Sequence, residues 1–289
     1  MSRLHFWWLL VFALIPAARV TQAASAHLSW TNNLLTVRDA RLPGGSLEVY
    51  YLEAFCLPGG HDRPWGQTRL PHQTALITTA PDASELRFRT TIGPDIEVLH
   101  EVRVSSGDTL LEMDFLLMHR GTNAWKVQWF QPACVRVDRF TGSVQSNYTA
   151  GSFVFTPSGH TPLDQVRRTT NALYLGGQVY LPPWVNAEDA NPRPVALDRI
   201  TNGLIGCVSG DGRSLLALAS DRTFELFEGV YVCLHSDPWI GGLNPGESRR
   251  IRQKLYLLPN DTDRLLRQYQ ADFPRSGASR DRVTGPAEF

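Results

Sequence analysis

The sequence has little net charge, little lysine and little cysteine. Its 28 basic and 28 acidic side chains give a formal net charge of +0. A balanced surface gives no electrostatic reason to bind nucleic acid or anionic lipid. Lys126 and Lys254 are the only lysines. Four cysteines in 289 residues are too few for a disulfide scaffold. We therefore expect no nucleic-acid partner, and a fold that does not depend on a disulfide framework.

The four cysteines, Cys56, Cys134, Cys207 and Cys233, lie in apolar, strand-like segments with no CxxC pair. Buried thiols or one inter-strand disulfide are therefore favoured over a metal cluster, and the sequence leaves all three full pairings open. The chain also has no HExxH or HxH spacing, no GxSxG elbow, no P-loop and no GxGxxG. We expect neither a metal nor another cofactor.

The N-terminus has the pattern of a secretory signal peptide. Arg3 precedes an apolar run over residues 6–16, and small residues follow, with cleavage expected after Ala23 or Ala26. The run is short for a membrane span, although a retained anchor is the alternative. No later stretch is long and apolar enough to cross a membrane. We predict a signal peptide over residues 1–23 and a secreted or periplasmic protein without a transmembrane segment once the peptide is removed.

A period of two dominates the rest of the chain. Apolar residues alternate with polar ones in residues 96–104 and again from Leu111, and Gly107 lies between these runs, as in a tight hairpin. Asp211-Gly212 joins residues 204–209 to 214–220 in the same way. Long alternating strands predict antiparallel sheets packed face to face. The fold class is therefore an all-β antiparallel sandwich over residues 24–275.

Helical spacing occurs near the end, where Asn260 or Asp261 could cap a short segment with its apolar residues on one side. The tail over residues 276–289 is polar and is expected to be flexible. Two stretches rich in proline, glycine and aromatics, residues 56–74 and 174–203, are predicted to form ordered loops across one end or face of the sandwich. No internal repeat or linker divides the chain, so we predict one domain.

Cys233, His235 and Asp237 alternate in YVCLHSDPW. On a strand, side chains two residues apart share a face at about 6.7 Å, so the outer pair is about 13 Å apart. Three residues of one straight strand therefore cannot bind one metal ion. Pro238 is expected to end the strand and leave Asp237 at a turn. The two interpretations are a His–Asp pair at the rim of a sheet, or a buried thiol beside a hydrogen-bonded histidine.

Residues 125–142 bring aromatic and polar groups together. Alternation places Trp125, Val127 and Trp129 on one face, and Cys134 and Arg136 share a face after Pro132. Aromatic rings stack on the apolar faces of sugars, while amide and guanidinium groups pair with hydroxyls. The alternative is a sandwich core with a salt-bridged outer face. The loop that contains Trp65 and His72 is a further candidate, because exposed loops often carry binding residues.

Several segments, among them CLPGGHDRPWGQTRLPHQT, WFQPACVRVDRFTG and GVYVCLHSDPWIGGLNPGES, resemble uncharacterised exported bacterial proteins. The strand pattern and the L-x-PGE turn at Leu243 to Glu247 also resemble galactose-mutarotase-type supersandwich domains. That second resemblance implies a supersandwich-like fold that binds sugars and, in enzymes, uses a histidine with a carboxylate base. The epimerase histidine motifs are absent here, so no catalytic residue is carried over.

These observations favour an exported β-sandwich that binds or processes carbohydrate on a sheet face. The alternatives are a structural or assembly protein of the cell envelope and, less favoured, a metal-dependent hydrolase. His235 and Asp237 are the expected catalytic pair if a reaction occurs. The expected ligand-binding residues are Trp65, His72, Trp129, Gln131 and Arg136.

Overall fold

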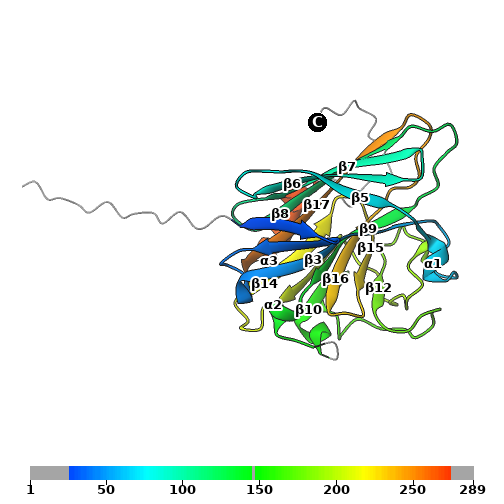
Figure 1. Cartoon of the computed structure of the whole chain (residues 1–289). Coiled ribbons are helices and arrows are strands. Elements are labelled where there is room, and N and C mark those ends of the chain that lie inside the picture. The colour runs from blue at the N-terminus through cyan, green and yellow to red at the C-terminus, as the bar shows by residue number, and fades with distance from the viewer. Residues whose placement is uncertain (1–25, 145–146, 275–289) are drawn as a thin grey trace, which may run out of the picture.

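The structure, a computed structural model, describes residues 26–144 and 147–274. The predicted signal peptide and the predicted tail from residue 276 lie outside the described residues. Two antiparallel sheets pack face to face (Figure 1), which confirms the all-β sandwich predicted from the alternation. Within the described ranges, no helix is long and apolar enough to cross a membrane.

The eight-stranded sheet runs in the order β1 (His27–Thr31), β2 (Leu34–Arg38), β3 (Ser46–Cys56), β9 (Trp129–Arg136), β16 (Cys233–Pro238), β15 (Thr223–Glu228) and β12 (Gln178–Tyr180), with β4 (Arg69–Leu70) paired to β3. The nine-stranded sheet runs in the order β11 (Gly159–Pro162), β10 (Ser152–Thr156), β13 (Leu204–Val208), β14 (Ser214–Ser220), β17 (Ser248–Pro259), β8 (Thr109–His119), β7 (Ile96–Val104), β6 (Glu85–Ile92) and β5 (Gln73–Thr79). The short helices are α1 (Trp65–Thr68), α2 (Asp138–Thr141) and α3 (Thr262–Asp272), with 3-10 turns at Pro43–Gly45, Tyr148–Gly151 and Ala187–Asp189.

Both hairpins predicted from glycine positions are present, because β7 pairs with β8 and β13 pairs with β14. The predicted C-terminal helix is α3. Of its two candidate caps, Asp261 is the one used, since its Oδ1 accepts a hydrogen bond from the backbone N–H of Arg264 at 2.8 Å.

The inner faces of the two sheets form one large apolar core. His100 of β7 lies inside this core, stacked on Phe88 with ring centroids 5.1 Å apart. Both of its ring nitrogens have partners, with the Tyr51 hydroxyl 2.6 Å from Nδ1 and the Thr90 hydroxyl 2.9 Å from Nε2. Burial lowers the pKa of His100 to about 3. His100 is therefore a neutral, hydrogen-bonded core residue.

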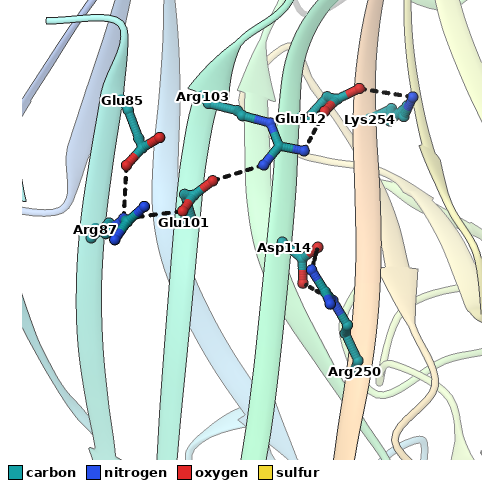
Figure 2. A network of polar contacts seen from close by, with 8 residues as sticks. All are labelled: Glu85, Arg87, Glu101, Arg103, Glu112, Asp114, Arg250 and Lys254. Atoms are coloured by element: carbon teal, nitrogen blue, oxygen red, sulfur yellow. Dashed lines mark hydrogen bonds and ion pairs between the residues drawn. The ribbon is translucent and has the colours of Figure 1, made fainter. Parts of the chain in front are cut away.

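The outer face of the nine-stranded sheet is covered in two ways. Helix α3 packs Leu265, Tyr269 and Phe273 on one part. A ladder of ion pairs covers the strands β6, β7, β8 and β17 (Figure 2), with Arg103 between Glu101 at 2.8 Å and Glu112 at 2.6 Å. The residues of this ladder are Glu85, Arg87, Glu101, Arg103, Glu112, Asp114, Arg250 and Lys254. The part of this face that α3 does not cover is thus a salt-bridged, solvated surface.

The outer face of the eight-stranded sheet is covered only in part. The chain after β12 crosses it and packs Leu181, Val185 and Ala190 on Trp129 and Phe224. This confirms the expectation that the second long loop crosses a face of the sandwich. Beside the covered part, the same face forms the floor of a cleft.

Candidate functional site

A cleft of about 350 Å³ opens on the outer face of the eight-stranded sheet. Three neighbouring strands, β3, β9 and β16, supply its floor: Glu53, Gln131, Cys134, Arg136, Cys233 and His235. Loops, α1 and the strands β3 and β15 supply its rim: Tyr50, Trp65, Asn191, Arg193, Phe227 and Tyr231. The cleft therefore combines aromatic, amide, guanidinium, carboxyl, thiol and imidazole groups.

Four residues predicted from the sequence meet in this cleft: Trp65, Gln131, Arg136 and His235. Asp237 lies directly behind His235, with its Oδ1 3.6 Å from His235 Nδ1. The Gln131 side chain connects the two strands, because its Nε2 donates to Asp237 Oδ2 at 3.0 Å. His235 and Asp237 are thus a buried pair at the floor of the cleft.

The expected position of Asp237 at a turn is wrong. Strand β16 does end at Pro238, but Asp237 belongs to the strand and has 0 % exposure. The residue opposite Asp237 in the register of the neighbouring strand β15 is Glu225. An acidic side chain can occupy this buried position because Gln131 donates a hydrogen bond to it and the His235 imidazole lies beside it.

Trp129 and His72 do not line the cleft. Trp129 has 0 % exposure and stacks on Phe224, with ring centroids 5.4 Å apart and an interplanar angle of 7°. The ring of Trp65, which lines the cleft, packs on Trp129 with ring centroids 6.3 Å apart. The ring of His72 makes an edge contact with the ring of Phe55, with ring centroids 5.4 Å apart, and its Nε2 is 3.3 Å from the carbonyl oxygen of Leu52. Trp129 thus supports the rim, and His72 packs elsewhere.

The strand β9 changes face at Pro132. Gln131 precedes this proline and Cys134 follows it, yet both point into the cleft. Simple alternation would place residues three apart on opposite faces. The pairing of β9 with β3 shifts register between Tyr51 and Ala54, opposite Pro132. This irregularity brings the amide of Gln131 and the thiol of Cys134 to the same side of the sheet.

Two thiols and an imidazole form a cluster at the floor of the cleft. Cys233 and Arg136 are register partners, as are Leu234 and Val135, so His235 lies beside Cys134 of the neighbouring strand. One ligand atom from each of Cys134, Cys233 and His235 lies within 4.8 Å of the other two. The Cys233 sulfur is 3.6 Å from His235 Nε2. All four cysteines of the chain are free, buried thiols.

The cluster stabilises a negative charge on Cys233 and a positive charge on His235. The hydrogen bond from the Cys134 thiol lowers the pKa of Cys233 well below its usual range, and His235 acts in the same direction. Burial alone lowers the pKa of His235, but Cys134, Asp237 and Cys233 outweigh it and raise that pKa above its usual range. The arrangement therefore favours a thiolate beside an imidazolium, the pairing that makes a cysteine reactive or able to bind a metal ion.

Sequence reasoning missed the carboxyl groups around this pair. Glu225 has 0 % exposure, and its Oε2 accepts the backbone N–H of Asn191 at 3.0 Å. Burial, followed by the charge of Asp237, raises the pKa of Glu225. Burial also raises the pKa of Glu53. The signal for Glu225 was present, since a glutamate inside the apolar run TFELFE is costly to bury without a partner.

No protein-family model matches the chain, and no curated protein matches it. Among solved structures, the Slr1438 protein from Synechocystis sp. PCC 6803 is 13 % identical, with 81 % of this chain and 95 % of that chain covered and a TM-score of 0.41. A putative aldose 1-epimerase from Escherichia coli K12 is 9 % identical, with 81 % and 98 % covered and a TM-score of 0.38. One from Klebsiella pneumoniae is 11 % identical, with 89 % and 87 % covered and a TM-score of 0.39. At these values the matches say nothing about the ligand or reaction of this chain.

Proposed function

We propose that the protein binds carbohydrate in the cleft on the outer face of the eight-stranded sheet. The observation that carries this proposal is the meeting of exposed aromatic rings and fixed hydrogen-bonding groups in one cavity. Its volume of about 350 Å³ falls within the range of small-ligand sites, about 300–1,000 Å³. The setting we propose is outside the cytoplasm, on the strength of the N-terminal sequence pattern.

The rim supplies the apolar contacts. Tyr50 is 36 % exposed and Tyr231 is 69 % exposed, so both rings offer surface to a ligand. Trp65 lines the same cleft, with its ring packed on Trp129. Sugar rings present C–H faces to such side chains, and the stacked geometry excludes water from both surfaces.

The floor supplies the polar contacts. Arg136 is held in place because its Nη1 donates to the Tyr231 carbonyl at 3.1 Å and its guanidinium lies 5.3 Å from the centroid of the Tyr231 ring. Gln131 is fixed by its bond to Asp237. Arg193 reaches the rim from the opposite loop. Positioned donors of this kind pair with sugar hydroxyls or with a sugar carboxylate.

Proton transfer by His235 with Asp237 remains part of the proposal. The imidazole reaches the floor of the cleft, where a bound ligand would meet it, and Asp237 contacts it from behind. General acid catalysis by the protonated imidazole needs this combination of access to the ligand and an orienting partner. The binding proposal does not require it.

The test is a glycan array with the purified protein, followed by affinity measurements on any ligand it finds. We expect Trp65→Ala and Arg136→Ala each to weaken binding at least about 10-fold, the size of a lost charge-assisted hydrogen bond or stacked ring. The matched controls are Trp184→Ala and Arg213→Ala, because Trp184 is exposed and Arg213 is highly exposed, and neither lines the cleft. A blank array, or equal losses in the controls, would refute the proposal.

A further inference from the structure

We propose that Cys134, Cys233 and His235 form a binding site for one thiophilic metal ion, Zn²⁺ or Cu⁺, at the floor of the cleft. The sequence-based expectation of no metal rested on spacings within single strands. The structure brings the third ligand from the neighbouring strand: Cys233 and His235 belong to β16, and Cys134 belongs to β9. All three are buried and line the same cavity.

The distances suit a soft metal ion. Bonds of about 2.3 Å to sulfur and about 2.0 Å to nitrogen at tetrahedral angles place the ligand atoms about 3.5–3.8 Å apart. The Cys233 sulfur lies 3.6 Å from His235 Nε2, and the whole set lies within 4.8 Å. A contraction of about 1 Å by side-chain rotation completes the geometry. Two thiolates and an imidazole are the donors that select zinc and cuprous copper over calcium or magnesium.

A second observation points to the same site. The imidazole Nε2 faces the sulfurs, and Nδ1 faces the Asp237 carboxylate at 3.6 Å. His235 Nδ1 and Asp237 Oδ1 are both buried without another hydrogen-bond partner. In metal sites, a carboxylate on the far side of a ligating histidine fixes its tautomer and raises its basicity. Gln131 holds Asp237 in that position, and Phe227 packs its edge against the imidazole at 5.3 Å.

The site is open on one side. Three protein ligands leave the fourth position of a tetrahedral ion facing the cavity, which is the arrangement of zinc sites that bind water or substrate. Glu53 lines the same cavity, and its Oε2 is buried without a hydrogen-bond partner. The metal site does not rest on the carbohydrate proposal, because its ligands and its test involve no sugar. A metal ion on Nε2 would leave that nitrogen unable to exchange a proton with a ligand, so metal occupancy also decides the role of His235.

The experiment uses the full chain, reduced and stripped of metal under anaerobic conditions. Zn²⁺ is titrated against a chromophoric competitor, Cu⁺ against a cuprous chelator in a separate arm, and Co²⁺ serves as the spectroscopic probe. We expect one equivalent of Zn²⁺ or Cu⁺ to bind per chain, and a sulfur-to-cobalt charge-transfer band. The two arms distinguish the ions. Metal binding also releases thiol protons, which a weakly buffered titration detects.

The variants make the assignment specific. Cys134→Ala, Cys233→Ala and His235→Gln should each weaken binding more than about 100-fold, and Asp237→Asn should weaken it about 10- to 100-fold. The matched control is Cys207→Ala, since Cys207 is an equally buried thiol in the sandwich core. It should bind within about 2-fold of the unmodified chain.

Three outcomes would overturn the proposal. The first is substoichiometric binding of both Zn²⁺ and Cu⁺ by the reduced, folded chain. The second is an equal loss of affinity in Cys207→Ala. The third is a Cys134–Cys233 disulfide that persists under the reducing conditions and blocks both ions. Circular dichroism of each variant separates loss of the site from loss of the fold.

Discussion

Trp129→Ala should lower the free energy of unfolding by about 3–5 kcal/mol, the range for truncating a buried tryptophan. The side chain has 0 % exposure, and its ring stacks on Phe224. Its Nε1 also donates to the carbonyl oxygen of Asp189 at 3.2 Å. The substitution therefore leaves a cavity, removes an aromatic pair and leaves that carbonyl without its donor. Trp129→Phe keeps a ring but loses the hydrogen bond, so we expect about 1–3 kcal/mol.

The measurement is equilibrium unfolding in urea, read as a shift in midpoint at constant slope. The control is Trp184→Ala, which removes a tryptophan that is 39 % exposed and should change stability by less than about 0.5 kcal/mol. A cost below about 1 kcal/mol for Trp129→Ala, or a cost equal to that of Trp184→Ala, would contradict the reasoning. Trp129 would then not be the support beneath Trp65.

Three further predictions concern the scaffold. The pKa of His100 is lowered from 6.5 to about 3, so between these pH values the unfolded chain protonates its imidazole and the folded chain does not. The free energy of unfolding should therefore fall by up to about 1.4 kcal/mol per pH unit as the pH drops from 6.5 to 3. His100→Gln should flatten that slope in acid unfolding curves, and an unchanged slope would contradict the burial. Arg103→Gln breaks its partly exposed pairs with Glu101 and Glu112 in the ladder (Figure 2), so it should cost less than about 1 kcal/mol and be neutral in high salt. A salt-independent cost would contradict this. Asp261→Ala removes the N-cap of α3, which accepts the backbone N–H of Arg264, and should lower the free energy of unfolding by about 1 kcal/mol in thermal unfolding. Asp261→Asn should lower it by less.

The fold was largely predictable because the residues of a strand alternate between two faces, so a half-buried strand shows apolar and polar residues in alternation. The alternation in residues 96–104, the glycine at 107 and the helical spacing after Asp261 each had one simple local cause, and each prediction is confirmed.

The site was only partly predictable because it depends on which strands are neighbours. Alternation showed that Cys233 and His235 share a face, but no local pattern shows that Cys134 pairs beside them. Trp129 was expected in the site because its ring lies in the sequence beside amide and guanidinium groups, a combination that suits sugars. Here the loop after β12 covers it. The register shift between β3 and β9 at Pro132 could not be predicted either, because a β-bulge depends on the partner strand as much as on the strand's own sequence.

Hydrogen exchange with and without the glycan identified by the array tests the central claim, that the cleft is the binding site, most directly. We predict that bound glycan slows amide exchange in residues 131–136, 189–193 and 229–235, the segments that form the floor and rim. The amides of the strands that carry the ion-pair ladder on the opposite sheet should exchange at an unchanged rate. Protection confined to that sheet, or to the ends of the sandwich, would show that the glycan binds elsewhere.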